Sequence, residues 1–341
     1  MRRIVFVLIV FILLICGSFF YLLQPYYKLW NTLTNQSLIK FVFGKDKIIS
    51  KNEINLLLLG RGDSTHEGAN LTDSIQIANI NIQKKEIKLI SLPRDIYIKD
   101  MQDKINTIYI YALQKDPNTA LQETKNKFSK ILGMDIDYVA LIDFNAFTDI
   151  IDALGGIEVY VLRPFVDEKY PIKGKENDLC NGDFSLACRY ETRTFSLGNQ
   201  TMDAPQALAF VRSRYAQGEE GTDFARQSRT QQVISSIVTK MRQVILANKP
   251  NILTQIYLST DKNITRDFSN EIALDIIKQL EYGKDLKFTK ADTATDYWKR
   301  DDPNKYKGIY VLTPPKQDFT KMQQYIKCLF IDTNCERFIP K

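Results

Sequence analysis

Short apolar runs alternate with amphipathic helical patterns along this chain, and this alternation constrains its fold more than any other feature. The run INLLLLG at 54–60 is bounded by charge and glycine, as a buried strand is, and β-rich segments follow at 74–82 and 86–95. Helical spacing occurs over 118–133 and over 223–246. Strands that alternate with helices usually form one sheet covered by helices on both faces. The sequence therefore predicts an α/β fold with a largely parallel or mixed sheet.

Weaker patterns predict the remaining elements. A Gly-Gly pair ends a helix over 145–156, and Asp203 with Pro205 marks the start of another at 204–214. Residues 163–199 show neither period and are expected to be irregular. We further expect helices at 104–115, 269–282 and 318–329, and strands at 137–144, 157–161 and 308–314.

The N-terminal run at residues 4–23 carries no charge and follows Arg2 and Arg3. At about 1.5 Å per residue, such a run spans a bilayer core of roughly 30 Å. Arginines before the span remain in the cytoplasm, so we expect an uncleaved signal-anchor in the cell membrane, with the following chain extracytoplasmic. The expected organisation is residues 1–3 in the cytoplasm, a span at 4–23, a juxtamembrane stalk at 24–52, a main domain at 53–247 and a C-terminal extension at 248–341.

The cysteines form two close pairs, Cys180 with Cys188 and Cys328 with Cys335, while Cys16 lies in the apolar run. An extracytoplasmic location is oxidising enough for disulfides, and each short loop closed in this way is worth about 2–3 kcal/mol. We therefore expect both pairs to be disulfides, with free thiols as the alternative. No C-x-x-C spacing is present, which argues against a structural metal.

Charge and missing motifs exclude several functions. The net charge of +6 comes without a basic cluster, so we expect no nucleic-acid partner. His66 is the only histidine, and the chain has no G-x-S-x-G, no H-E-x-x-H and no Walker A lysine. Most histidine-based mechanisms and the common nucleotide-binding loop are therefore excluded.

The polar segment LGRGDSTHEGANLTDS, residues 59–74, follows the first strand. It is not a dinucleotide fingerprint, because Thr65 stands at the third glycine position and no helix pattern follows. Its R-G-D tripeptide permits an adhesion function, which would need an exposed hairpin. We instead expect a loop between two parallel-sheet strands, at the edge where open α/β sheets bind ligands. Asp73 is either a turn former or, beside a polyphosphate, a ligand for Mg²⁺.

Arginines stand beside acids at the ends of several predicted elements. Guanidinium groups suit phosphates, and a helix N-terminus adds positive charge of its own, so this placement predicts an anion site. The alternative is that each arginine is an ordinary surface or salt-bridged residue. The residues concerned are Arg94 beside Asp95, Arg212 with Arg214, and Asp223 with Arg226 and Arg229.

A series of segments carries a family resemblance. They are INLLLLG, LTDSIQIANINIQKKEIKLISLPRDIYI, INTIYIYA, YVALIDFNAFTDIIDALGGIEVYV, LGNQTMDAPQALAFVRSRY and TDFARQSRTQQVISSIVTKM. In this order, behind a single membrane anchor, they resemble the LytR-CpsA-Psr family of bacterial cell-wall proteins over residues 54–242. The resemblance implies an αβα sandwich with a central mixed sheet and identifies residues 53–247 as the catalytic domain.

The resemblance also implies an activity. The family transfers glycopolymers, such as teichoic acid, from an undecaprenyl-pyrophosphate carrier to peptidoglycan. The lipid lies in an apolar channel, and arginines and Mg²⁺ bind the pyrophosphate. By position, the metal ligand would be Asp73, and the proton acceptor would be Asp95 or Asp223. The pyrophosphate ligands would be Arg94, which also acts in catalysis, and Arg212, Arg214, Arg226 and Arg229.

The first motif departs from the usual family pattern. GRGD is one residue longer, and Leu71 stands where the family commonly has an arginine. Asp63 is the candidate second metal ligand, and Arg61 is the candidate replacement for the missing arginine. Two other functions stay open, namely a non-catalytic membrane-anchored protein that binds polyprenyl phosphates and a polyprenyl-pyrophosphate hydrolase.

Overall fold

The structure, a computed structural model, describes residues 24–33, 48–62, 70–280, 285–293, 295–331 and 334–339. The predicted membrane span at 4–23 and the predicted metal ligand Asp63 lie outside these ranges. Within them, no helix has the length and the apolar character that crossing a membrane requires. Part of the predicted stalk, residues 24–33, is helical.

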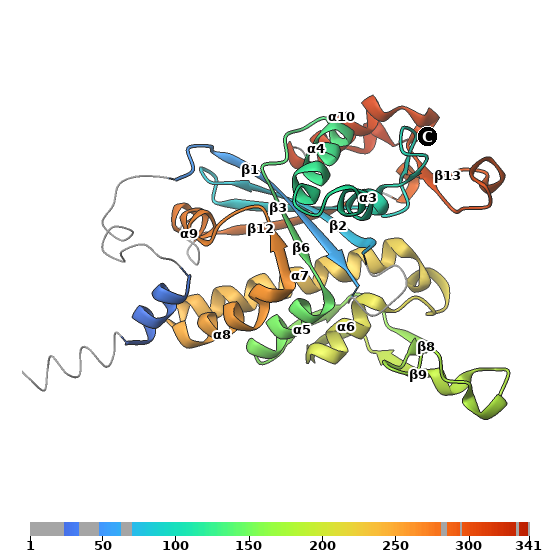
Figure 1. Ribbon diagram of the computed structural model, residues 1–341, viewed down its shortest axis with the longest axis horizontal. Helices are drawn as coiled ribbons and strands as arrows, with labels where there is room; N and C mark the ends of the chain where they lie inside the picture. The colour runs from blue at the N-terminus through green and yellow to red at the C-terminus, as the bar shows by residue number, and fades with distance from the viewer. Residues whose placement is uncertain are drawn as a thin grey trace, which may run out of the picture.

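A mixed sheet lies at the centre of the molecule, with its strands in the order β11-β6-β1-β2-β3-β12 (Figure 1). β1 pairs with β2, β2 with β3 and β6 with β11 in antiparallel fashion, whereas β1 with β6 and β3 with β12 are parallel. The mixed sheet expected from the sequence is therefore confirmed. The strands are β1 (Glu53–Arg61), β2 (Thr72–Asn81), β3 (Glu86–Leu92), β6 (Tyr138–Ile142), β11 (Ile264–Arg266) and β12 (Lys287–Asp292).

The pairing of β1 with β2 corrects one expectation. The polar segment 59–74 connects antiparallel neighbours, not parallel strands. A parallel pair needs a long crossover, usually a helix, and this segment is too short and too polar to supply one. The ladder shifts register between Gly60 and Arg61, where a Cβ on Gly60 would come within 3.0 Å of the Ser74 Cβ.

Two helical layers cover the sheet (Figure 1). On one face, α4 packs against β6 and α10 against β3, and on the other α7 packs against β3 and β12. The first layer contains α3 (Ile108–Lys115), α4 (Ala120–Leu132) and α10 (Phe319–Ile331). The second contains α5 (Phe144–Ala153), α6 (Ala204–Arg212), α7 (Asp223–Leu246) and α8 (Pro250–Thr260), and α9 (Asn270–Gln279) packs near the start of β1.

Side chains alternate along each strand, so the two helical layers contact different side chains of the sheet. Leu57 and Leu59 of β1, with Ile75 and Ile77 of β2, are buried in the core shared with α3, α4 and α10. Successive side chains on a strand point to opposite faces. The opposite face therefore carries Gly60, Ser74 and Gln76, which are small or polar, toward the second layer.

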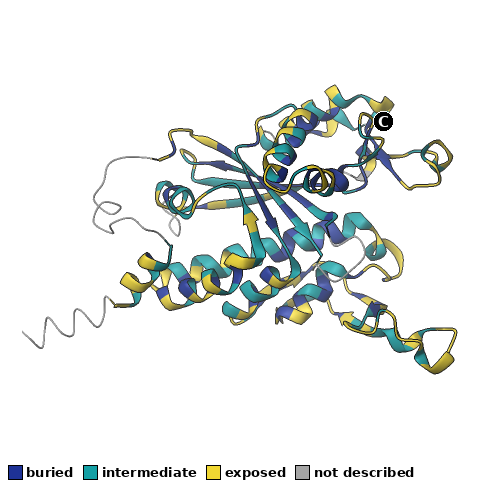
Figure 2. Cartoon of the chain, viewed as in Figure 1, coloured by how far each residue is buried: buried dark blue, intermediate teal, exposed yellow. Residues whose placement is uncertain are grey.

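Residues 163–199, expected to be irregular, contain an antiparallel hairpin. β8 (Phe165–Pro171) pairs with β9 (Tyr190–Phe195), and the segment between them projects from the body as an arm with a largely exposed surface (Figures 1 and 2). The sequence did not predict this hairpin, because its strands are short and their exposed faces are mostly polar. Beside it, β7 (Ile157–Val161) pairs with β10 (Gly198–Met202) in a separate small sheet.

The C-terminal residues 248–341 contribute both edge strands of the central sheet, β11 and β12. The predicted helices near 269–282 and 318–329 are confirmed as α9 and α10, whereas the predicted strand at 308–314 is reduced to β14. The minor strands are β4 (Tyr97–Ile98), β5 (Asp103–Lys104), β13 (Lys299–Arg300) and β14 (Leu312–Thr313). The short 3₁₀ helices are Ile105–Thr107, Cys180–Gly182, Ala187–Arg189, Gly218–Gly221, Asp261–Asn263, Thr295–Tyr297, Pro303–Tyr306, Pro315–Gln317 and Glu336–Phe338.

Candidate functional site

A cluster of arginines and aspartates joins segments that are far apart in the sequence. Arg94, just after β3, places its Nη1 2.7 Å from Asp73 Oδ1 on β2 and its Nη2 3.4 Å from Asp223 Oδ2 on α7. Arg226 Nη2 lies 3.0 Å from Asp223 Oδ1, and Arg214 Nη2 lies 3.8 Å from Asp73 Oδ2. The fold thus brings together the acids and arginines that the sequence placed at separate element ends.

Local capping explains how these side chains reach one place. Thr222 caps α7 by accepting a hydrogen bond from the Ala225 amide, which puts Asp223 and Arg226 in the first helical turn. At the other end of the loop, α6 ends at Arg212, and Ser213 takes a non-helical conformation that turns the chain away. Arg214 therefore comes to lie opposite Asp73.

In this cluster the guanidinium groups of Arg94, Arg214 and Arg226 surround the carboxylates of Asp73 and Asp223. Burial opposes ionisation of Asp73, but Arg94, Arg226 and Arg214 outweigh it and hold the pKa of Asp73 below its usual range. The pKa of Asp223 is likewise lowered, by Arg226, Arg94 and Arg214 against burial. Burial, followed by repulsion from Arg94 and Arg214, lowers the pKa of Arg226 to about 10. A bound anion would relieve this repulsion, so the cluster is suited to a phosphate group.

An adjoining cavity of about 410 Å³ lies between the sheet and the second helical layer. Its polar end is formed by Asp73, Arg214 and Arg226, with Arg212 also in its lining. Apolar side chains from β1, β6, α5, α6 and α7 line the rest, namely Leu58, Ile142, Phe147, Val211 and Ile234. The space exists because the strands present Gly60, Ser74 and Gln76 here where large apolar side chains would fill it. The arrangement accommodates a ligand with an anionic head and an apolar tail.

Arg229 does not join the anion site. Its side chain is 2% exposed, and its nitrogens donate hydrogen bonds to the carbonyls of Phe210, Ser213 and Glu220 and to the Glu220 carboxylate. With its donors committed to the protein, the guanidinium holds the loop after α6 instead of facing a ligand. The predicted role of Arg229 as a pyrophosphate ligand does not agree with this geometry.

Asp95 is also placed away from the cavity lining. It is 4% exposed, and its carboxylate lies 2.6 Å from the Lys104 Nζ and 3.4 Å from the Arg94 Nε. These ion pairs balance the negative charge of Asp95, and its burial leaves the carboxylate little access to an acceptor hydroxyl. Of the two predicted proton acceptors, Asp223 is the more accessible, with a side chain 30% exposed.

Arg61 and Arg212 occupy different surroundings from the rest of the cluster. Arg61 donates a hydrogen bond to Asn70 and acts electrostatically on Tyr109 of α3, so it lies toward the first helical layer and not in the cavity lining. Arg212 lines the cavity with its guanidinium carbon 4.8 Å from the ring centroid of Phe144 and 5.9 Å from that of Tyr170.

Sequence reasoning missed Asp167 and Gln76. Asp167 is fully buried in β8, and its Oδ2 accepts hydrogen bonds from the amides of Arg214 and Tyr215, which fixes the backbone that carries Arg214. Gln76 is 1% exposed and lines the cavity; its Nε2 donates to Ser91, while its Oε1 has no protein partner. Asp167 lies in the segment read as irregular, and a polar residue inside an alternating strand was the only signal for Gln76.

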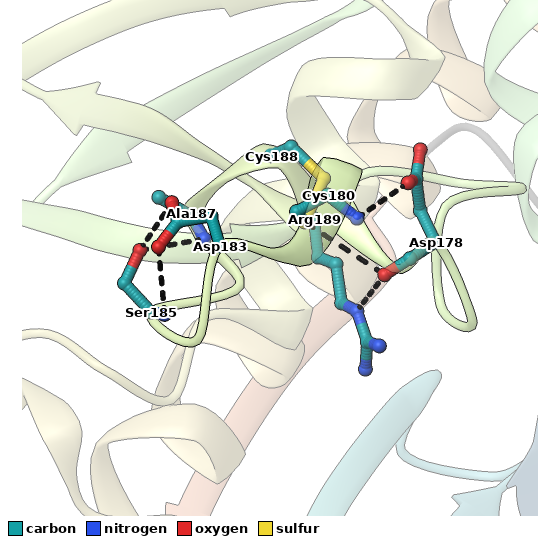
Figure 3. Close-up of a disulfide and its surroundings, with 7 residues drawn as sticks. All are labelled: Asp178, Cys180, Asp183, Ser185, Ala187, Cys188 and Arg189. Atoms are coloured by element: carbon teal, nitrogen blue, oxygen red, sulfur yellow. Dashed lines mark hydrogen bonds between the residues drawn. A yellow bond between two sulfur atoms is a disulfide. The ribbon is translucent and has the colours of Figure 1, made fainter.

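Both predicted disulfides, Cys180–Cys188 and Cys328–Cys335, are present. In the part of the chain that the structure describes, the acids and cysteines close enough together to hold a metal are Asp178, Cys180 and Cys188 (Figure 3). Because these cysteine sulfurs are bonded to each other, they are not available as thiolate ligands.

An α/β sandwich with arginines at one end of an apolar cavity is a fold whose site suits an anionic amphiphile. The model of the LytR_cpsA_psr family matches residues 31–327. The chain therefore belongs to the LytR-CpsA-Psr family.

Curated relatives agree with this membership. One from Bacillus mycoides, named polyisoprenyl-teichoic acid–peptidoglycan teichoic acid transferase TagU, is 31% identical over 225 residues. That alignment spans 64% of this chain and 63% of the relative, slightly under two thirds of its length. A relative of the same name from Bacillus cereus is 28% identical over 278 residues, which are 80% of this chain and 78% of that protein.

Solved structures share the fold. TagV from B. subtilis matches with a TM-score of 0.57 and 21% identity over 84% of this chain and all of that one (100%). A structure titled TagT bound to LIIa-WTA matches with a TM-score of 0.53 and 18% identity over 87% of this chain and 97% of that chain. At these identities the likeness concerns the fold alone.

Proposed function

We propose that this protein is a phosphotransferase that moves a glycopolymer from an undecaprenyl-pyrophosphate carrier to peptidoglycan. The observation that carries the proposal is the apolar cavity whose polar end holds Asp73, Arg214 and Arg226. A polyprenyl chain suits the apolar lining, and a pyrophosphate suits the guanidinium groups of Arg214 and Arg226. The names of the TagU relatives support the same reaction class and favour teichoic acid as the polymer.

The reaction is a substitution at phosphorus. A hydroxyl oxygen of peptidoglycan bonds to the phosphorus that carries the glycopolymer, the bond from that phosphorus to the bridging oxygen breaks, and undecaprenyl phosphate leaves with the electron pair. Arg214 and Arg226 stabilise the charge that develops on the phosphoryl oxygens. Arg94 orients Asp73 and Asp223 through its ion pairs. Asp223, the more exposed of the two candidate carboxylates, accepts the hydroxyl proton.

We propose Mg²⁺ as the cofactor, with Asp73 as the described carboxylate that would hold it. Asp73 lines the cavity, one of its oxygens pairs with Arg94, and the other lies 3.8 Å from Arg214, beyond hydrogen-bond distance. Mg²⁺ typically binds one or two carboxylates together with phosphate oxygens. Asp73 would hold the ion, with Asp63 as the proposed second ligand, and the ion would neutralise pyrophosphate charge. Chelation should stop turnover, and Asp73→Asn should raise the Mg²⁺ concentration that restores it.

We also propose that residues 4–23 anchor the protein in the cell membrane with its catalytic domain extracytoplasmic. This places the lipid-linked donor and peptidoglycan on the same side as the cavity. Membrane fractionation and added protease should find the full-length chain in membranes, with the catalytic domain accessible from outside. Recovery of a shortened soluble form would contradict the anchor.

Transfer assays test the activity. The full chain in a lipid bilayer receives a polyprenyl-pyrophosphate-linked saccharide and peptidoglycan, and coupled product is measured. Arg214→Ala should lower turnover about 100-fold or more, since removal of one charged donor at the reacting group has effects of this size. Arg163→Ala is the matched control, because Arg163 is 60% exposed and pairs with Glu219 on the surface.

The controls separate the other functions. Release of phosphate without acceptor, with no coupled product when acceptor is present, would identify a hydrolase. Binding of the donor without turnover would identify a binding protein. Full transfer activity in both Arg214→Ala and Asp73→Ala would overturn the site assignment.

A further inference from the structure

A second cavity, of about 220 Å³, adjoins the first on the side of the β8–β9 arm. The two cavities share Phe144, Pro171 and Arg212 in their linings. Because Arg212 is held over the rings of Phe144 and Tyr170, its guanidinium forms part of the wall between the two spaces. A ligand in the second cavity would therefore lie against Arg212, on the other side of this wall from the first cavity.

The linings of the two cavities differ in chemistry. The first is largely apolar beyond its charged end. The second brings together Asn145 and Thr148 of α5, Lys173 and Glu176 of the arm, and the ring of Phe144. This mixture of amide, hydroxyl, ammonium and carboxylate groups can both donate and accept hydrogen bonds, which matches a ligand with many hydroxyl and amide groups. An aromatic ring in the wall suits the apolar face of a sugar.

We propose that this second cavity binds the acceptor saccharide of peptidoglycan and presents its hydroxyl to the phosphorus held at Arg214 and Arg226. The inference rests on the function proposed above. In a phosphoryl transfer the attacking and leaving oxygens lie roughly in line, so the acceptor must approach from outside the cavity that holds the departing lipid. The second cavity is separate from the first and meets it at Arg212, so it is a place from which the acceptor can approach. Arg212 then borders both substrates.

The arm holds Lys173 and Glu176 in place. The Ile172 amide donates to the Arg189 carbonyl at 2.8 Å. The Arg189 Nε donates to the Asp178 carbonyl at 2.7 Å (Figure 3). The Cys180–Cys188 disulfide joins the two sides of the arm just beyond these bonds (Figure 3). Hydrogen bonds at Ile172 and Asp178 thus hold the chain before Lys173 and after Glu176.

Kinetics of the full chain in a lipid bilayer test the proposal. The acceptor probe is a soluble peptidoglycan oligosaccharide, and the donor is a polyprenyl-pyrophosphate-linked saccharide. Lys173→Ala and Glu176→Gln should each raise the KM for the acceptor about tenfold or more, with a much smaller change in the KM for the donor. Lys175→Ala is the matched control, because Lys175 is an exposed lysine of the same arm outside the lining of either cavity.

Direct binding gives a second measurement. Calorimetric titration of the same oligosaccharide into the full chain should show weaker binding to Lys173→Ala than to the wild type or to Lys175→Ala. An unchanged acceptor KM and unchanged binding in both cavity variants would overturn the acceptor site. A rise in the donor KM alone would place the donor's glycan there instead, which also overturns it. Absence of transfer by the wild type would refute the proposed function itself, a distinguishable result.

Discussion

Arg226 and Arg229 lie one helical turn apart on α7, yet their guanidinium groups have different partners. Arg226 meets Asp223 and lines the cavity, while Arg229 is buried among the carbonyls of the loop after α6. Helical spacing places both residues near one face of α7, but it does not determine which groups each side chain contacts. Neighbouring residues of the same type can therefore serve ligand binding and folding separately.

Loss of Arg229 should destabilise the fold. Arg229→Ala leaves Glu220 and several buried carbonyls without their partner, so we expect the free energy of unfolding to fall by about 3–5 kcal/mol. Urea denaturation followed by circular dichroism measures this change. Arg229→Lys should not restore stability, because an ammonium cannot reproduce the fork of contacts. If Arg229→Ala kept wild-type stability but lost transfer activity, Arg229 would instead be a ligand of the anion.

Asp73 and Asp223 predict how stability responds to acid. Both pKa values are lowered from 3.8 in the folded protein, because the arginines outweigh burial. The stability that these carboxylates contribute is therefore complete above pH 3.8 and is lost as the pH falls through their lower folded values. The difference in thermal midpoint between wild type and Asp73→Asn should be constant from pH 5 to 7 and shrink below about pH 4. A difference that changes between pH 5 and 7 would contradict the lowered pKa.

At the scale of elements, the two disulfides have different structural settings. Cys180–Cys188 closes the projecting arm. Cys328, in α10, and Cys335 are instead buried in the core, 6% and 4% exposed. Loop closure by either bridge is worth about 2–3 kcal/mol to the segment that it constrains. Where that segment is part of the core, the constraint acts on the whole fold.

Removal of each disulfide should therefore have a distinct effect. Cys328→Ser with Cys335→Ser should lower the global thermal midpoint by several degrees, since about 2–3 kcal/mol is lost from the core. Cys180→Ser with Cys188→Ser should leave the midpoint nearly unchanged but make the arm sensitive to protease. Calorimetry and limited proteolysis measure the two effects. Equal shifts in midpoint for both pairs would show that the arm unfolds together with the core.

At the scale of the whole molecule, the sheet depends on both ends of the sequence. β11 covers the edge at β6 and β12 covers the edge at β3, and both strands come from residues 248–341. The family match likewise continues to residue 327. The C-terminal residues are thus part of the central sheet as well as a cover over it.

Truncation after residue 247 should prevent folding. The loss of β11 and β12 turns the inner strands β6 and β3 into new sheet edges, and newly exposed edges promote aggregation. We expect the truncated chain to be insoluble or to unfold without cooperativity, as judged by size-exclusion chromatography and calorimetry. Replacement of residues 173–189 by an Asn-Gly turn is the control, because the projecting arm can be shortened without opening the sheet. A soluble, cooperatively folding truncation would show that the sheet tolerates open edges.

The sequence by itself determined the elements and the family. Helices α4 and α7 follow from a period of 3.6, β2 from alternation, and β1 from an apolar run bounded by charge and glycine, all of which are local properties of the chain. The linear sequence alone shows arginines and acids at the ends of predicted elements. It therefore singled out Arg94, Arg214, Arg226 and Asp73. The hairpin of β8 and β9 escaped because its short, polar strands lack that signal.

Only the tertiary structure decided the pairing and the surroundings. The antiparallel neighbours β1 and β2, the edge strands β11 and β12, the burial of Arg229 and the cavity beside the arm all depend on contacts between distant segments. Such contacts form where they bury the most apolar surface while satisfying buried polar groups, and this balance is a property of the assembled molecule. A local pattern specifies whether a segment forms a helix or a strand, and packing of the core decides which other segments it contacts.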